Sequence, residues 1–175
     1  MKTRLIELLQ PFSRRIGPAL GLALCLGGSA RAATTVEVVE PLEYQVIQRT
    51  TRDRGVIPVV THVNADGKTP DVVEVWWVGE SGAGIWQPLR LRGGTRAELG
   101  LDAPSGGWFR LEVRARDAGA VVANAVVEHV GVGEVLVVAG QSNSANHGEE
   151  KLTTQTRLVA TFDGKRWGLS KDPQP

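Results

Sequence analysis

The sequence predicts a mainly β protein, in which a sandwich of short strands is followed by the first strand, helix and strand of an α/β domain. Two observations lead to this prediction. In residues 34–132, short stretches rich in β-branched and aromatic residues alternate with turns, and no helical period lies between them. Residues 135–139 then form an unbroken apolar run, which is typical of a strand buried on both faces of a parallel sheet.

Length and charge limit the classes of protein to consider. The 175 residues allow one large domain or two small ones. The formal net charge of +1 indicates neither nucleic acid nor an anionic membrane as a partner. We divide the chain into a leader over residues 1–33, a β-sandwich domain over 34–132 and the start of a second domain over 133–175.

The leader has the pattern of a secretory signal peptide. Lys2 and Arg4 belong to a basic beginning, residues 16–28 form a short apolar core, and Ala30 and Ala32 offer an A-x-A cleavage site. The apolar core is too short to span a bilayer. The alternative, a buried amphipathic helix, is disfavoured because glycine and proline interrupt the run. The sequence therefore predicts a secreted or periplasmic protein with no membrane contact after cleavage.

The sandwich is predicted from the number and spacing of its strands. Leucine, valine and alanine alternate with charged residues after Trp108, which indicates a strand with one wet face. Pro58 argues for an edge position or a bulge in its strand. Seven or eight strands at this spacing favour an immunoglobulin-like or fibronectin-like sandwich. The predicted strands cover residues 36–39, 44–49, 56–63, 72–78, 86–91, 96–101, 108–116 and 121–130.

Four tryptophans, Trp76, Trp77, Trp86 and Trp108, lie on these predicted strands. Because side chains alternate along a strand, one indole of the Trp76–Trp77 pair is expected to face the core and the other the opposite side. Aromatic residues at such positions are more often part of a core, but these four are also candidates for stacking on sugars.

The segment after the sandwich carries the strongest functional pattern. Gly140 allows a sharp turn at the end of the apolar run, and Ser142 then follows just past the carboxyl end of the expected strand. A serine raised on such a turn can act as a nucleophile, with the N–H groups of the next helix beside it. The alternative is structural, since serine is also a favoured helix N-cap.

The tetrapeptide Gly140, Gln141, Ser142 and Asn143 resembles the block that opens the catalytic domain of sialate O-acetylesterases and related carbohydrate esterases of the SGNH (GDSL-like) hydrolase superfamily. The resemblance implies a flavodoxin-like α/β hydrolase domain with Ser142 as its catalytic nucleophile. It also implies that Gln141 and Asn143 position the serine or help to form the oxyanion site. Stabilisation of the turn is the alternative role for both.

The same family uses a later asparagine in a Gly-x-Asn-Asp-like setting and a histidine in Asp-x-x-His, and this sequence has neither pattern. His147 lies only five residues after Ser142 on the same local segment, so we do not expect it to be the base. The chain is therefore expected to be the amino-terminal part of an esterase and catalytically incomplete. We predict a short, packed hinge at residues 131–133, without a flexible linker, and, after Ser142, a helix over 143–152.

Beyond this helix, residues 158–162 are predicted to form a strand that ends at a turn over 163–164, followed by a further extended piece over 166–167. His62 and His129 lie on predicted strands without metal-ligand spacing, so we interpret both as structural. The clustered arginines of residues 49–54 are interpreted as a solvated loop face. No metal or organic cofactor is predicted.

The resemblance thus predicts a secreted enzyme that removes O-acetyl groups from sialic acid or other sugars through a serine acyl-enzyme. Its partner would be an acetylated carbohydrate. Two alternatives remain at this point: a non-catalytic β-sandwich module that binds glycans, in which the Ser142 segment is structural, and a truncated product without a function of its own.

Overall fold

The structure is a computed structural model that describes residues 33–65, 68–141 and 150–173. Within these ranges every regular element is a β-strand, and no helix occurs. Except for residue 33, the predicted leader lies outside the described residues. The strands are β1 (Thr35–Glu40), β2 (Gln45–Gln48), β3 (Arg54–Asn64), β4 (Val72–Gly79), β5 (Gly82–Ala83), β6 (Gln87–Pro88), β7 (Arg90–Arg92), β8 (Arg96–Pro104), β9 (Trp108–Asp117), β10 (Ala120–Gly133), β11 (Ala160–Phe162) and β12 (Trp167–Leu169).

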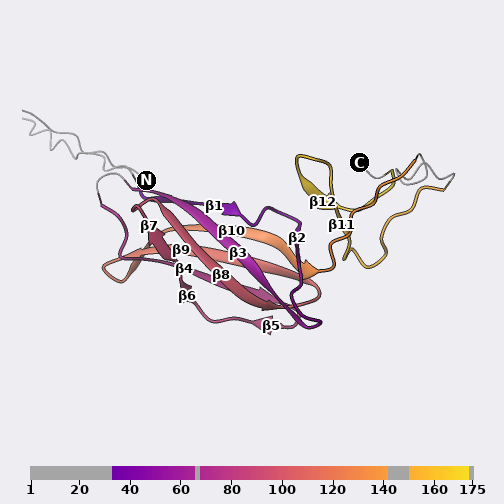
Figure 1. Cartoon of the computed structure of the whole chain (residues 1–175). Helices are drawn as coiled ribbons and strands as arrows, with labels where there is room; N and C mark the ends of the chain where they lie inside the picture. The colour runs from indigo at the N-terminus through magenta and orange to yellow at the C-terminus, as the bar shows by residue number, and fades with distance from the viewer. Residues whose placement is uncertain (1–32, 66–67, 142–149, 174–175) are drawn as a thin grey trace, which may run out of the picture. The chain divides into compact units, whose positions relative to one another are not determined.

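Two principal sheets contain most of these strands (Figure 1). One sheet has the order β1-β3-β8-β7, and the other has the order β2-β10-β9-β4-β5, with β6 paired to β4. Neighbouring strands are antiparallel except for β10 and β2, which run parallel from Val130 opposite Gln45 to Gly133 opposite Gln48. The prediction of a mainly β region with several sheets is confirmed.

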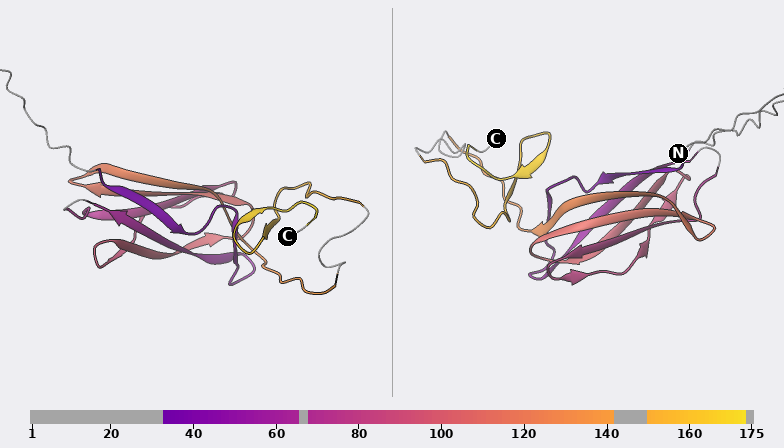
Figure 2. Two further views of the ribbon diagram at one scale, coloured as in Figure 1. Left: turned by 90° about the horizontal axis from the view of Figure 1, so that it is seen from above. Right: turned by 180° about the vertical axis from the view of Figure 1, so that it is seen from behind.

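The hydrophobic core lies between the two sheets, whose strands run in two layers (Figure 2). Ile57 of β3 and Leu101 of β8 contribute from one sheet, and Phe109 and Val113 of β9 from the other; all four are fully buried. Trp77 packs its ring against Phe109 edge to face, with ring centroids 5.1 Å apart. One shared core between two sheets is the arrangement of a β-sandwich.

Alternation along the strands agrees with the sequence prediction. In β4, Val73, Val75 and Trp77 are buried, whereas Glu74 and Trp76 face outward and are half-buried. The same period of two runs along β9. The prediction that one indole of the pair faces the core and the other the opposite side is therefore confirmed.

A two-residue turn joins β9 to β10. Ala118 and Gly119 both have positive φ values, 48° and 81°. Two consecutive positive φ values define the type I′ turn, whose twist matches that of an antiparallel hairpin. The Asp71 carboxylate accepts a hydrogen bond from the Ala118 N–H at 2.8 Å and so supports the less usual conformation of alanine.

Pro58 shows how an interior strand accommodates a proline. β3 pairs with both β1 and β8, so it is not an edge strand, as one of the sequence alternatives had it. β1, however, pairs only with residues 60–64 of β3, and Pro58 lies beyond its end, opposite Gly100 of β8. A residue without an N–H is tolerated at this position because β1 does not extend far enough to pair with it.

The segment after residue 150 contains a separate small hairpin of β11 and β12. The Asp163 carboxylate accepts hydrogen bonds from the N–H groups of Arg166 at 2.7 Å and Lys165 at 2.8 Å, which hold the turn together. These backbone bonds, that of Arg166 first, lower the pKa of Asp163. The strand predicted over 158–162 and its turn are confirmed, with the strand shortened to three residues.

Residues 131–133, predicted to be a short packed hinge, are packed, but they are not a separate connection between two parts of the chain. These residues are the end of β10 and pair with residues 46–48 of β2. A Cβ atom on Gly131 would lie 3.1 Å from the Trp108 ring, so this glycine serves close packing rather than bending.

The strand predicted over residues 135–139 is not formed. Leu136, Val137 and Val138 are 81%, 93% and 73% exposed. A strand needs a neighbour for its backbone groups, and the parallel partner β2 ends at Gln48, opposite Gly133. The predicted helix over 143–152 falls mostly outside the described residues, and residues 150–152 are not helical. The predicted strand–helix–strand order is thus not seen in the described part of the chain.

Candidate functional site

Of the three predicted site residues, the structure describes only Gln141, which is exposed. Ser142 and Asn143 lie outside the described residues, as does His147. The described residues nearest to them form the path that leads from β10 to Gln141.

The start of this path is fixed to the sandwich by polar contacts. The side chain of Gln48 accepts a hydrogen bond from the Val135 N–H at 2.7 Å and donates one to the Glu134 carboxylate at 3.0 Å. Arg49 forms an ion pair with Glu134, and its own N–H donates to the carbonyl of Gly133 at 2.8 Å. The hydrogen bond from Gln48, and then Arg49, lower the pKa of Glu134.

A lowered carboxyl pKa gives a pH dependence with a defined sign. The stabilisation from Glu134 is present above its unfolded pKa, near the ordinary value of 4.5, and is lost as pH falls through its lower folded pKa. We expect the NMR titration midpoint of the Glu134 carboxyl carbon to lie below 4.5 and to rise toward that value in Gln48→Ala. A wild-type midpoint at or above 4.5 would contradict these contacts.

An apolar groove with a volume of about 870 Å³ lies beside the path. Its walls come from the end of the sandwich, from the exposed run after β10 and from the β11–β12 hairpin; they include Val46, Trp108, Val135, Leu136, Leu158 and Phe162. Most of the lining is apolar, so the groove can hold an apolar group, although Glu134, Thr161 and Ser170 also line it.

Trp108 connects the wall of the groove to the segment after residue 150. Its indole N–H donates to the carbonyl of Arg157 at 2.8 Å. Tyr44 meets the indole edge to face, with centroids 5.5 Å apart, and its ring stacks on His129 at 4.5 Å. Tyr44 has a φ of 61°, in the left-handed region, and its N–H donates to the carbonyl of His129 at 2.7 Å. The aromatic group thus holds the segment at Arg157 against the end of the sandwich.

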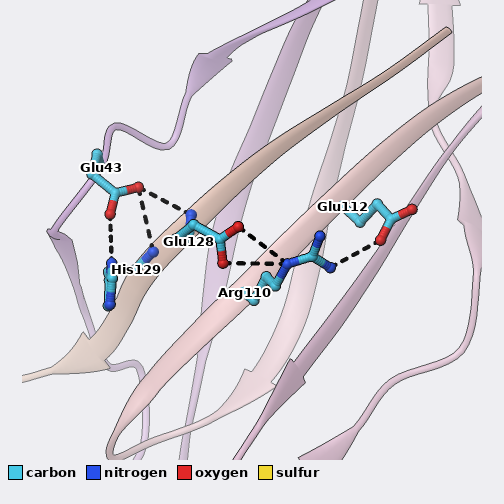
Figure 3. A network of polar contacts seen from close by, with 5 residues as sticks. All are labelled: Glu43, Arg110, Glu112, Glu128 and His129. Carbon is cyan, nitrogen blue, oxygen red and sulfur yellow. Dashed lines mark hydrogen bonds and ion pairs between the residues drawn. The ribbon is translucent and has the colours of Figure 1, made fainter.

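His129 is part of a polar network on the outward face of β9 and β10, drawn in Figure 3. Its Nδ1 lies 2.6 Å from Oε1 of Glu43, and Oε2 of Glu43 accepts the backbone N–H of Glu128 at 3.0 Å. An N–H on Nδ1 that donates to the carboxylate leaves Nε2 pointing away from Glu43 (Figure 3). The network fixes the connection between β1 and β2 to β10, which agrees with the structural role predicted for His129.

Arg110 continues this network. It donates to Glu112 at 2.9 Å and to Glu128 at 3.3 Å (Figure 3). The hydrogen bond to Glu112, and then that to Glu128, raise the pKa of Arg110. No group of three or more metal-ligating side chains occurs within residues 33–65, 68–141 and 150–173.

A second cluster, which we call the indole face, consists of Glu74 and Trp76 on β4, Arg114 on β9, and Trp86 just before β6. The two indoles stack with centroids 5.9 Å apart and ring planes 24° apart. Arg114 lies 3.7 Å from the centroid of Trp86 and binds Glu74 at 2.9 Å. The sequence had marked both indoles as candidates for sugar stacking, but it gave no signal for Glu74 and Arg114 because their contact depends on strand register.

The arginines of residues 49–54 do not gather into an anion site. Arg49 pairs with Glu134, and Arg54 pairs with Asp102 of β8 through a forked contact whose Nε–Oδ2 distance is 2.8 Å. These bonds raise the pKa of Arg54 and lower that of Asp102. Arg52 is exposed, and its carbonyl accepts from Arg49 at 2.9 Å. This agrees with the solvated loop face predicted from the sequence.

Comparisons with known proteins give little beyond this geometry. No protein-family model matches the chain, and no curated protein matches it. One solved structure, the crystal structure of an engineered protein, is similar with a TM-score of 0.40 and 18% sequence identity. The match covers 59% of this chain and 20% of the other. Among the described residues, no helix is long and apolar enough to cross a membrane.

Proposed function

We propose that this chain belongs to a secreted carbohydrate esterase of the SGNH type, which removes O-acetyl groups from sialic acid or other sugars. The observation that carries the proposal is the Gly-Gln-Ser-Asn block at residues 140–143, directly after an apolar run. In this proposal residues 34–132 form an immunoglobulin-like domain, and residues from 133 onward begin the hydrolase domain.

The proposed chemistry has two steps. The hydroxyl of Ser142 attacks the acetyl carbonyl, the sugar alcohol leaves with a proton, and the acetyl group remains bound to the serine oxygen as an ester. Water then attacks this acyl-enzyme, which releases acetate and restores the hydroxyl. Gln141 and Asn143 would orient the serine or donate hydrogen bonds to the oxyanion. The reaction needs no metal and no organic cofactor.

Two features of the described residues support this proposal. The contacts of Gln48 and Arg49 with Glu134 fix the path toward Ser142 to the sandwich at its first residue. The run of Leu136, Val137 and Val138 is exposed, so its apolar side chains contribute little to the sandwich core. An exposed apolar run next to an apolar groove is the kind of surface that folded protein normally covers. The leader over residues 1–33 supports export.

The proposal requires a base for Ser142, because a serine hydroxyl at its ordinary pKa is a poor nucleophile. The most economical test is the reading frame that follows Pro175. An Asp-x-x-His sequence encoded there supports the esterase. A stop codon directly after Pro175, or a downstream sequence without this pattern, contradicts it.

For the 175-residue chain itself we expect negligible ester hydrolysis, because the sequence lacks Asp-x-x-His. The measurement is release of 4-nitrophenol from 4-nitrophenyl acetate, with heat-denatured protein as the background control. Turnover well above this background that disappears in Ser142→Ala would show that another group, such as His147, acts as the base.

A further inference from the structure

The outward side of the second sheet has an unusual composition. Two indoles, of Trp76 on β4 and of Trp86 just before β6, stack on each other where a sandwich normally exposes small polar side chains. Both are only half-buried. Neither indole belongs to the core cluster, so burial in the core does not explain why tryptophans occupy these positions.

Contacts of Gly84 with Trp76 and Trp77 hold this indole pair in place. The indole N–H of Trp76 donates to the carbonyl of Gly84 at 2.9 Å. The backbone N–H of Gly84 donates to the carbonyl of Trp77, also at 2.9 Å. A Cβ atom on Gly84 would lie only 2.5 Å from the Trp77 indole, so glycine is required for this close approach. The loop that carries Trp86 is therefore tied to β4, and the two rings are preorganised.

Polar groups lie next to the rings. Arg114 covers part of Trp86 and binds Glu74, which also lies 3.7 Å from Arg116. The indole N–H of Trp86 has no hydrogen-bond acceptor among the described residues, although a buried or half-buried indole N–H usually finds one. Arg114 has five N–H donors, of which the contact with Glu74 uses one.

Charge on this face is balanced. The outward arginines of β9 all pair with glutamates: Arg110 with Glu112 and Glu128, and Arg114 and Arg116 with Glu74. Such internal pairing does not favour an anionic ligand. Glu74, beside the rings, is a residue type that is depleted at the core of protein interfaces, although tryptophan and arginine are enriched there.

We propose that the indole face binds a neutral oligosaccharide, with the C–H side of a pyranose ring against the indole surface that Arg114 leaves uncovered. Sugar hydroxyls bind the indole N–H of Trp86, the N–H donors of Arg114 that Glu74 does not use, and the carboxylate of Glu74. This site is distinct from Ser142 and does not depend on the esterase chemistry. It would let the sandwich hold a glycan chain.

The test is isothermal titration calorimetry of the chain with three neutral probes: cellohexaose, xylohexaose and mannohexaose. We expect at least one to bind saturably with a Kd below about 1 mM. Trp86→Ala should weaken this binding about tenfold or more, and Trp86→Phe, which keeps a ring but loses the N–H, should weaken it by a smaller factor. Ile85→Ala is the matched control, because Ile85 is the exposed neighbour in the same loop and lies outside the indole face.

NMR of the five tryptophan indole N–H signals decides the case even if Trp86→Ala fails to fold. Binding at the indole face should shift the signals of Trp76 and Trp86 and leave that of Trp108 in place. The proposal is overturned if none of the probes binds at concentrations up to about 10 mM. It is also overturned if a folded Trp86→Ala binds like the wild type, or if the shifts are confined to Trp108 and Trp167.

Discussion

Replacing Phe109 with alanine is expected to lower the free energy of unfolding by about 3–5 kcal/mol. The Phe109 ring is fully buried and packs edge to face on Trp77. It also lies on Gly79, where a Cβ atom would be 2.6 Å from the ring. Because backbone and a large indole surround the ring, the neighbours cannot collapse into the space it leaves, and the cavity cost adds to the lost burial. A loss of this size is a large part of the stability of an ordinary domain.

Urea unfolding followed by tryptophan fluorescence measures this effect. The matched control is Phe162→Ala, because Phe162 is 48% exposed on the β11–β12 hairpin and should cost much less. Equal losses for the two variants would contradict a sandwich core centred on Phe109.

The second large effect is catalytic. In a polypeptide that includes a downstream Asp-x-x-His, Ser142→Ala is expected to reduce kcat for 4-nitrophenyl acetate by about a thousandfold or more, because the variant cannot form the acyl-enzyme. The melting temperature should stay unchanged if the serine only carries out chemistry. Steady-state kinetics and thermal unfolding of the same preparation separate the two effects.

Ser144→Ala is the matched control for this prediction. It removes the same hydroxyl group two residues away on the same segment. Its kcat should stay within a few-fold of the wild type. A similar loss in both variants would indicate damage to the segment, and an active Ser142→Ala would remove the serine from the mechanism.

Local pattern was sufficient to predict most of the sandwich. The alternation in β4 and β9 assigned the buried Trp77 and the outward Trp76, because the period of two is a direct consequence of strand geometry. The pairing of Gly131 with Val46 was not predictable in this way. Whether a glycine bends the chain or lets another residue pack closely depends on its neighbour across the sheet, here the ring of Trp108.

The apolar run after β10 shows where pattern is insufficient. Residues 135–139 have the composition of a buried strand, yet a strand also needs a partner, and the pairing of β10 with β2 ends at Gln48. The composition of a segment indicates whether its side chains can be buried. Whether it forms a strand also depends on which other strands are available to pair with it. The residues that follow, Ser142 and Asn143, lie outside the described part of the chain, so their proposed roles rest on the sequence block.

The side-chain contacts of the two surface clusters could not be predicted from the sequence either. The parallel pairing of β2 with β10 brings together Tyr44, His129 and Glu43. No local sequence motif predicts this long-range register. Glu74 and Arg114 meet for the same reason, through the pairing of β4 with β9. Sequence reasoning selected tryptophans as residue types but could not show which two of them stack.

Covalent labelling tests most directly whether the segment after the sandwich carries the nucleophile. A polypeptide with the downstream Asp-x-x-His would be treated with a fluorophosphonate, digested and analysed by mass spectrometry. We predict one phosphonate adduct, on Ser142, with loss of esterase activity in proportion to labelling. An adduct on another residue in an enzyme that hydrolyses esters, or full activity after complete labelling of Ser142, would contradict the assignment.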